Sequence, residues 1–244
     1  IIISGHRLND VNAKNFYFDD ITSGEVSFEY ASQYYWLTLS GVTAQCTRIG
    51  YVDGKLVQLN SNGINITASR PGTVHINLKG ENTFNNIDGM GMAIFKDVDI
   101  YGDGTLNMGT KSIGSYNGAD ITIKDCTVNA GRLVGSNNGG YLWVEHADLH
   151  LTGGTSGQSA ISKFELVGLD GCAITSPVSC IYDPDARNLL VDGSVYTGAV
   201  DITAYTEPVI SVEDITALID QYLEPDSDIT IEDITNLIDR YLEQ

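Results

Sequence analysis

Basic side chains are scarce in this 244-residue sequence, where 13 Lys and Arg stand against 32 Asp and Glu for a formal net charge of −19. Residues 200–244 hold twelve of these acids against Arg240 alone, a charge of −11 that leaves −8 for residues 1–199. Because an acidic surface repels phosphates, we expect no nucleic-acid partner.

Long apolar runs are also missing. No stretch approaches the roughly 18 apolar residues of a membrane-spanning helix, so we expect no transmembrane segment. The first residues, IIISGHRL, are too short and too polar for a signal peptide, and the sequence does not begin with Met. We expect a mature or truncated chain that is compatible with export.

Cysteine and proline are sparse. The four cysteines, Cys46, Cys126, Cys172 and Cys180, form no CxxC pair and no Cys/His spacing typical of zinc sites. Only 5 prolines accompany 26 glycines, a balance that suits a chain with many tight turns and excludes a collagen-like or disordered chain.

A repeat dominates residues 1–199. The segments VDIYGDGTLNM (98–108), ITIKDCTVNA (121–130) and LWVEHADLHL (142–151) each join two short alternating runs through a turn. Their apolar anchors recur every 21 to 25 residues, at Leu78, Ile100, Ile123, Val144, Leu169 and Leu190. This period predicts a parallel β-helix, right-handed and of about seven coils, with residues 1–36 as cap and first coil. An antiparallel sandwich is the alternative.

The register of the repeat also places two cysteines. Cys126 and Cys172 fall on the same inward position, with Ala147 on the coil between them. Two coils separate them by roughly 9 to 10 Å, which is beyond disulfide reach, so we expect buried thiols. Cys172 and Cys180 are closer in sequence and remain a possible pair.

These repeats resemble the pectate-lyase-like parallel β-helix proteins, and more narrowly the secreted Gly/Asn-rich β-helix modules of gut bacteria. The resemblance covers about residues 20–200 and implies an exported protein. Many members cleave acidic polysaccharides, but the polygalacturonase-like signatures NTD, DD, GHG and RIK are reduced here to Asp19-Asp20. Catalytic residues are therefore unknown, and a β-helix fold alone does not imply catalytic activity.

Two sets of side chains are candidates for a site. His146, Asp148 and His150 alternate onto one face and suggest a metal, although His146 and His150 lie about 13 Å apart on a straight strand. Aromatic residues suit the stacking of sugar rings, and we select Tyr116, Tyr141 and Trp143 as glycan-binding candidates. The run Tyr34-Tyr35-Trp36 is interpreted instead as a cap on the first coil.

The chain ends in a duplicated segment. Ser211 to Asp214 and Thr230 to Asp233 have the form of capping boxes. Apolar residues follow each box at helical spacing, namely Ile215, Leu218, Ile219, Tyr222 and Leu223 in the first copy and Ile234, Leu237, Ile238, Tyr241 and Leu242 in the second. We expect two helices over residues 200–244 that pair through these faces, since neither is long enough to be stable alone.

This ending resembles a type I dockerin, in the segments Asp214-Ile215-Thr216 and Asp233-Ile234-Thr235. The family binds calcium, but the first loop departs from its ligand pattern and implies no cofactor. The second loop implies at best a weak Ca²⁺ site at Glu224, Asp226, Asp228 and Asp233. The resemblance also implies a cohesin-like partner, with Val212, Glu213, Ile231 and Glu232 as contact residues, or else a cap on the solenoid.

The sequence therefore favours a secreted or cell-surface, non-catalytic binding or adhesion protein that presents its β-helix to a polysaccharide or another surface macromolecule. The alternative is a polysaccharide lyase or glycoside hydrolase on the same scaffold.

Overall fold

The computed structural model describes residues 1–3, 6–7, 21–46, 48–52, 55–59, 62–67, 71–155, 157–205, 212–223 and 229–242. The chain divides into two compact units, Ile1–Tyr205 and Thr206–Gln244. The sequence placed the boundary before residue 200, but β25 (Val200–Ala204) pairs with strands of the first unit and belongs to it.

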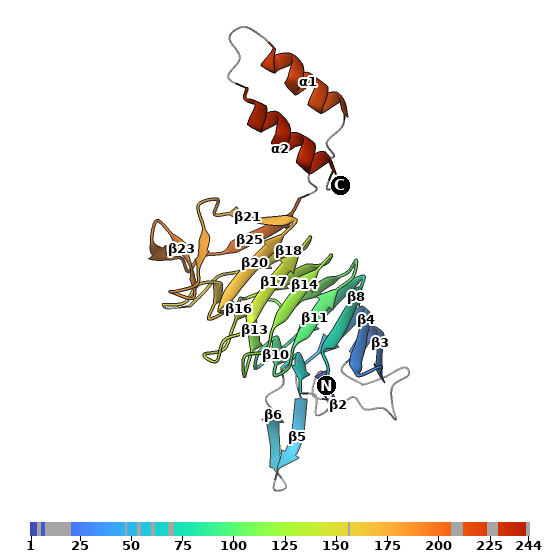
Figure 1. Ribbon diagram of the computed structural model, residues 1–244. Coiled ribbons are helices and arrows are strands. Elements are labelled where there is room, and N and C mark those ends of the chain that lie inside the picture. The colour runs from blue at the N-terminus through green and yellow to red at the C-terminus, as the bar shows by residue number, and fades with distance from the viewer. Residues whose placement is uncertain are drawn as a thin grey trace. The chain divides into compact units, whose positions relative to one another are not determined.

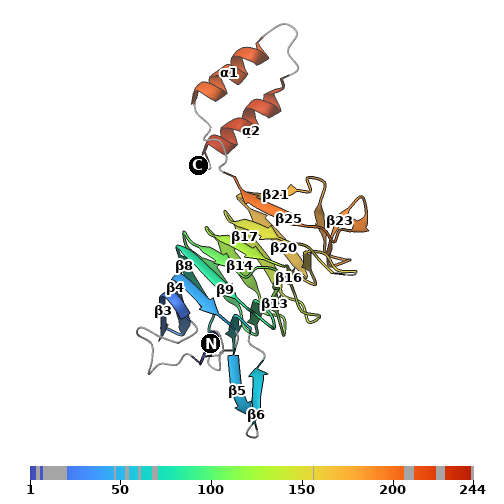
Figure 2. The same ribbon diagram turned by 180° about the vertical axis from the view of Figure 1, so that it is seen from behind.

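The first unit is a parallel β-helix with three sides (Figures 1 and 2). Sheet I consists of β4 (Tyr34–Gln45), β8 (Val74–Lys79), β11 (Val98–Tyr101), β14 (Ile121–Lys124), β17 (Tyr141–Glu145) and β20 (Leu166–Asp170). Sheet II continues it through the long β4 and consists of β9 (Glu81–Asn85), β12 (Thr105–Asn107), β15 (Thr127–Ala130) and β18 (Asp148–Leu151). Sheet III consists of β7 (Ile64–Ile66), β10 (Met92–Ile94), β13 (Ile113–Ser115), β16 (Leu133–Val134) and β19 (Ile161–Ser162).

Period-two alternation explains why these short strands stack. Within sheet I, Ile76, Ile100, Ile123 and Val144 occupy one register position on four successive coils, and all are fully buried. The side chains before and after them point outward. A single coil has no partner for its inward residues, so burial comes only from stacking on neighbouring coils.

The predicted β-helix is confirmed, but the predicted number of coils is wrong. The structure has about four turns, which correspond to the complete coils β8–β10, β11–β13, β14–β16 and β17–β19, rather than seven. Both ends of the repeat were counted as coils although the chain reverses there. Leu190, for example, lies in β23 (Asn188–Val191), which pairs antiparallel with β19, β22 (Ile181–Asp183) and β24 (Ser194–Val195).

Antiparallel strands cover the start of sheets I and II and the finish of sheet II, whereas sheet I finishes with the parallel strand β20. At the start, β3 (Ile21–Ala31) pairs with β4, and at the finish β25 lies between β18 and β21 (Cys172–Ser176). The remaining strands are β1 (Ile2–Ile3) and β2 (His6–Arg7) on the edge of sheet III and a hairpin of β5 (Arg48–Val52) and β6 (Lys55–Leu59).

The cap at the start explains one aromatic residue of the run 34–36 but not the other two. Tyr35 is buried and packs against Phe28 and Tyr30 of β3, with ring centroids 6.1 Å and 4.7 Å away. Tyr34 and Trp36 alternate outward and are 44% and 39% exposed. The interpretation of the whole run as a cap therefore holds only for Tyr35.

One asparagine lies inside the solenoid. The Asn82 side chain is fully buried where sheet I turns into sheet II. Its Oδ1 accepts the backbone N–H of Val42 at 3.0 Å, and its Nδ2 lies 3.2–3.3 Å from the carbonyl oxygens of Lys79, Gly80 and Thr105. Asn82 thus joins three successive coils at a corner where strand pairing is interrupted.

The prediction of buried thiols at Cys126 and Cys172 is confirmed, and Cys46 and Cys180 are buried as well. Cys126 and Cys172 follow β14 and β20 at the same inward position, with the buried Ala147 between their coils. Burial raises the pKa of Cys126 to about 12 and also raises the pKa of Cys172 and of Cys180.

We expect iodoacetamide at about pH 8 to label the native cysteines only slowly, because the thiolate is the nucleophile and burial disfavours it. After denaturation without reductant, all four cysteines should be labelled, as intact-mass measurement will show. A pair of cysteines that takes up label only after reduction would contradict the assignment of free thiols.

The second unit contains α1 (Val212–Tyr222) and α2 (Ile231–Leu242), which contact each other. The predicted helix pair is therefore confirmed. Its capping box at α2 is present, since Asp233 Oδ2 accepts the backbone N–H of Thr230 at 2.8 Å and Thr230 Oγ1 accepts the N–H of Asp233 at 3.2 Å. None of the described helices is long and apolar enough to cross a membrane.

Candidate functional site

The outer face of sheet I carries aromatic, acidic and basic side chains. Strand register arranges them in three rows that run from coil to coil, across the strands. The tryptophan row contains Trp36, His75, Asp99, Thr122, Trp143 and Gly168. The tyrosine row on one side contains Tyr34, Asp97, Asp120, Tyr141 and Leu166. The lysine row on the other side contains Thr38, Asn77, Tyr101, Lys124, Glu145 and Asp170.

At the first end of the tryptophan row, three side chains hold one another in place. The imidazole of His75 stacks on the Trp36 ring, with centroids 4.4 Å apart and an interplanar angle of 18°. The Tyr34 ring lies 5.2 Å from the imidazole on a tilt, and His75 Nδ1 lies 3.0 Å from Asp99 Oδ2. These contacts present an indole and a phenol in fixed orientations.

At the other end, the Trp143 side chain is 41% exposed and lies over Gly168 of the next coil. A Cβ at Gly168 would come within 2.1 Å of the indole carbons, so glycine is required for this ring position. Tyr141 stands beside it in the tyrosine row, where the charge of Glu165 and a hydrogen bond to it raise the pKa of the Tyr141 phenol.

Carboxylates of the outer face are already engaged by donors of the protein. Asp97 Oδ1 accepts the N–H of Asp120 at 3.0 Å, and Asp120 Oδ1 accepts the N–H of Tyr141 at 2.8 Å. In the lysine row, Lys124 Nζ lies 3.1 Å from Glu145 Oε2, and this hydrogen bond raises the pKa of Lys124.

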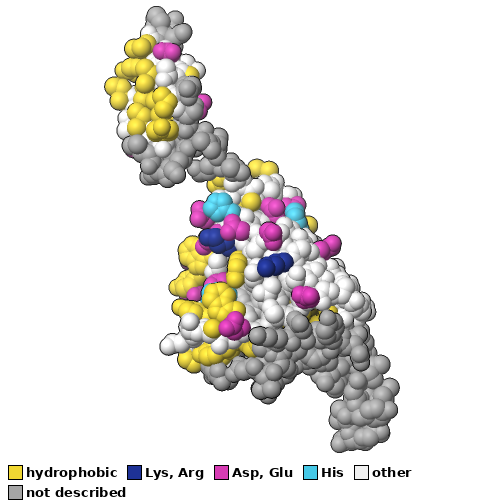
Figure 3. Space-filling view, turned by 90° about the vertical axis from the view of Figure 1, so that its right-hand side faces the viewer, with side chains coloured by type: hydrophobic (Ala, Val, Ile, Leu, Met, Phe, Trp, Pro, Cys, Tyr) yellow, Lys and Arg dark blue, Asp and Glu magenta, His cyan; other side chains and the backbone are white. Residues whose placement is uncertain are grey.

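The face is therefore apolar at both ends of the tryptophan row and polar between them. In the space-filling view of Figure 3, hydrophobic side chains, carboxylates and imidazoles lie close together on the solenoid. Exposed aromatic rings offer stacking surfaces, and the second oxygens of the engaged carboxylates can accept hydrogen bonds from hydroxyl groups.

The structure brings together two of the three glycan-binding candidates. Tyr141 and Trp143 share the outer face of sheet I, whereas Tyr116 follows β13 of sheet III, where it stacks on Phe95 at 4.6 Å and 10°. Sequence reasoning missed Trp36 and His75 as members of the face. The correct registers between β4 and β8 and between β8 and β11 were the signal that would have found them.

Two of the three metal candidates of the solenoid, Asp148 and His150, already have partners. His146 lies in a turn with φ of 47°, Asp148 Oδ1 accepts the N–H of Ala204 at 2.8 Å, and His150 Nδ1 lies 2.8 Å from Asp201 Oδ1. Within the described ranges no three His, Cys, Asp or Glu side chains are placed to hold a metal ion.

The calcium candidates Glu224, Asp226 and Asp228 lie outside the described residues. Asp233 belongs to the capping box, and its hydrogen bonds to Thr230 lower the pKa of its carboxyl group. Of the proposed contact residues, Val212, Ile231 and Glu232 are exposed, and the Glu213 side chain lies outside the described part of the chain.

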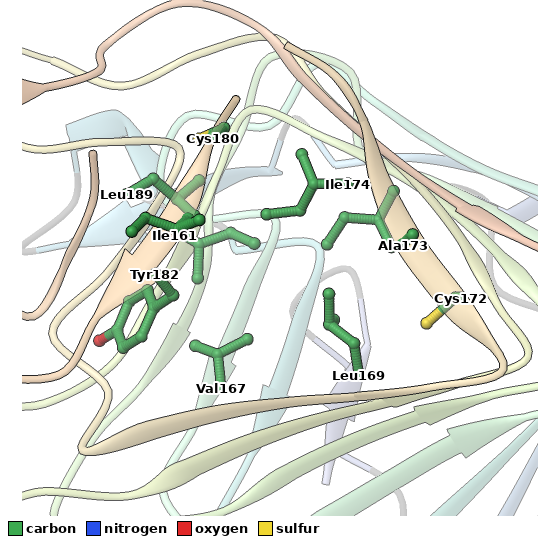
Figure 4. Close-up of a pocket in the computed structure, with 11 residues that line it drawn as sticks. Ile161, Val167, Leu169, Cys172, Ala173, Ile174, Cys180, Tyr182 and Leu189 are labelled. Carbon is green, nitrogen blue, oxygen red and sulfur yellow. The ribbon is translucent and has the colours of Figure 1, made fainter. Parts of the chain in front are cut away.

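A separate cavity of about 320 Å³ opens at the last coil (Figure 4). It is lined by Ile161, Val167, Leu169, Cys172, Ala173, Ile174, Cys180, Ile181, Tyr182, Leu189 and Ile202. Val167 and Leu169 continue the inward positions of Leu142 and Val144, so the cavity is the end of the hydrophobic core. The Tyr182 hydroxyl donates to the carbonyl of Phe164 at 2.5 Å, and most of the other side chains that line the cavity are aliphatic.

Comparisons of the whole chain with protein-family models, with curated proteins and with solved structures give no match. Function must therefore be argued from the residues of the site itself.

Proposed function

We propose that this protein is a secreted or cell-surface, non-catalytic glycan-binding protein, and that the outer face of sheet I is its binding surface. One observation carries the proposal. Two exposed tryptophans lie on the same row of the same face, with His75, Asp99 and Thr122 between them. Sugar rings present apolar C–H faces for stacking and hydroxyl groups for hydrogen bonds, and the row supplies partners for both.

The rigidity of the face supports binding. Trp36 is held by His75 and Tyr34, and Trp143 is positioned over Gly168, so both rings stand on packed strands rather than on loops. A ligand would therefore order few side chains on binding, which lowers the entropic cost of association.

A polysaccharide lyase or glycoside hydrolase is the second candidate function, favoured by the contact between His75 and Asp99. A carboxylate that orients an imidazole is an arrangement used for proton transfer. The measurement that separates the candidates is the release of reducing or unsaturated ends from every polysaccharide that the protein retains. Retention without release supports the binding protein, and release that is lost in His75→Ala supports the enzyme.

We expect Trp36→Ala and Trp143→Ala each to weaken retention by the bound polysaccharide about tenfold or more, since each removes a stacking surface at the centre of a binding subsite. Gly168→Ala should have a similar effect although it deletes no aromatic ring, because the new methyl group displaces the Trp143 indole. Affinity electrophoresis in native gels containing the polysaccharide measures the effect.

Tyr241→Ala in α2 is the matched control, because Tyr241 is 39% exposed, as is Trp36, but belongs to the other unit. Its mobility should equal that of the wild type. Equal retention of Trp36→Ala, Trp143→Ala and the wild type would contradict the proposed surface.

For the second unit we propose a dockerin-like role in binding a protein partner of the cohesin type. Exposed apolar side chains support it, since Val212 is 56% and Ile231 65% exposed at the starts of the two helices. The resemblance of the duplicated segments to type I dockerins supplies the partner class.

We expect calcium to contribute little to this unit. Asp233 already accepts hydrogen bonds from Thr230. A calcium site with a millimolar Kd stabilises the folded unit by only about 1.4 kcal/mol when the calcium concentration is about ten times the Kd. Because the pKa of Asp233 is lowered on folding, its stabilisation is present above about pH 4 and is lost as the pH falls through the lowered folded value.

Melting of the helical signal of the intact protein, with calcium and with chelator at neutral pH, tests this expectation. The two curves should coincide. A large drop on chelation would show instead an ordinary calcium-dependent dockerin.

A further inference from the structure

We infer that the outer face of sheet I takes an uncharged, linear glycan that lies along the tryptophan row, and that it rejects polyuronates. The inference rests on the proposed glycan-binding function and names the class of glycan. Two sets of observations carry it, namely the charges of the three rows and the direction in which the aromatic rings are spaced.

The charges of the face exclude a polyanion. The three rows contain five carboxylates, which are Asp97, Asp99, Asp120, Glu145 and Asp170. Against them stands one ammonium group, Lys124, which is paired with Glu145 and also lies in the fields of Asp125 and Asp170. His75 is occupied by Asp99. Among the described side chains of these rows, every cationic partner that a uronate needs is therefore already taken.

The borders of the face do not change this balance. Lys79 and Lys96 lie next to the rows in sequence, but so do Asp103, Asp125 and Glu165, and Arg187 is paired with Glu165 at 3.8 Å. Bringing a row of uronate carboxylates onto this surface would set like charges against one another, and the repulsion weakens only when salt screens it.

The net negative charge of the face attracts a polycation, but salt screens that attraction and it does not depend on the tryptophans. Asp97 and Asp120 each use one oxygen to accept a backbone N–H, while Asp99 and Glu145 are paired with His75 and Lys124. The remaining lone pairs of these carboxylate oxygens can accept hydrogen bonds from neutral donors. Hydroxyl groups are such donors, and a neutral glycan presents several on every ring.

The spacing of the rings sets the direction of the ligand. Trp36 and Trp143 are four strand steps apart in the register, which corresponds to about 19 Å at about 4.8 Å per step. A chain lying across the strands meets an aromatic ring at each end and the polar residues in the middle. A pyranose ring is about as long as one strand step, so a chain of about five rings places one ring on each tryptophan.

The inference is tested by affinity electrophoresis of the intact protein in gels containing hydroxyethyl cellulose, galactomannan or xyloglucan as neutral probes, polygalacturonate as the anionic probe and chitosan as the cationic probe. Each gel is run at low salt and at about 0.15 M ionic strength. The wild type, Trp36→Ala, Trp143→Ala and the control Tyr241→Ala are compared in every gel.

We expect at least one neutral polysaccharide to retain the wild type and Tyr241→Ala, with retention lost in both tryptophan variants and unaffected by salt. Polygalacturonate and chitosan should not retain the protein through the tryptophans. Tryptophan-dependent retention by polygalacturonate or chitosan overturns the inference and leaves the proposed binding function standing. If no probe gives tryptophan-dependent retention, the proposed function itself fails.

A length series tests the direction separately. With oligosaccharides cut from the retained polysaccharide, affinity should rise at least tenfold between about two and about five rings, when the ligand first spans both tryptophans. If an oligosaccharide of about two rings binds as tightly as one of about five rings, the ligand does not lie along the tryptophan row.

Discussion

Replacing Ile123 with alanine is expected to lower the free energy of unfolding of the solenoid by about 2 to 5 kcal/mol. The side chain is fully buried between Ile100 of the preceding coil and Val144 of the next. Because each coil buries its inward residues only against its neighbours, the cavity weakens two interfaces at once. Denaturant unfolding of the intact protein, followed by a signal of β structure, measures the loss.

Two variants calibrate this effect. Ile123→Val removes a single methylene and should cost about 0.5 to 1.5 kcal/mol, whereas Thr127→Ala changes a half-buried, outward residue of β15 and should lie within about 0.5 kcal/mol of the wild type. If Ile123→Ala and Thr127→Ala unfold at the same denaturant concentration, the assignment of inward and outward positions is wrong.

Replacing Asn82 with leucine is expected to lower the free energy of unfolding by about 2 to 4 kcal/mol, although the new side chain is apolar and has the same number of non-hydrogen atoms. The change leaves the buried N–H of Val42 without its acceptor and removes the donors to the carbonyls of Lys79, Gly80 and Thr105. A buried polar group that loses its hydrogen-bond partner lowers the free energy of unfolding by about 1 to 3 kcal/mol, and the substitution leaves several such groups at this corner.

Asn129→Ala is the matched control for Asn82. Asn129 is half-buried on the outside of sheet II, where its Nδ2 donates to Asn107 Oδ1, so it should cost about 1 kcal/mol or less. A cost of Asn82→Leu no larger than that of Asn129→Ala would show that the corner does not depend on the buried amide.

The inward residues could be predicted from the sequence because their pattern is simple. Alternation along each strand and a period of 21 to 25 residues identify Ile100, Ile123 and Val144 as partners, and the structure pairs them. Asn82 could not be found in this way. It occupies an inward position, but a polar side chain there carries no hydrophobic signal, and its four partners come from three coils.

The candidate site was predicted only in part, and a register error explains why. The sequence aligned Leu78 with Ile100, whereas the structure pairs Ile76 with Ile100. A register error of two residues leaves every side chain on the same face of the sheet, so the inward and outward positions are still predicted correctly. It does change the neighbours, because Asp99 is then set beside Asn77 instead of His75. The contact of His75 with Asp99, and the row on which they lie, were lost for that reason.

The coil count was wrong at the ends because hydrophobic repeats do not record strand direction. The segment around Leu190 has the alternation and turn of a coil, yet it runs antiparallel to its neighbours. Whether a strand pairs parallel or antiparallel depends on which strand of the sheet it meets, and the two partners are far apart in the sequence.

The reversed strands at the two ends determine how such a molecule can be lengthened. A further coil added before the first would meet the reversed strand β3, and one added after the last would meet the reversed strands β25 in sheet II and β23 in sheet III. A coil duplicated between β8 and β16 would instead find parallel neighbours on all three sides. Each inserted coil would move Trp143 one step of about 4.8 Å further from Trp36. On the proposed binding mode, the number of internal coils sets the distance between the two tryptophans, and both ends of the solenoid stay unchanged when that number changes.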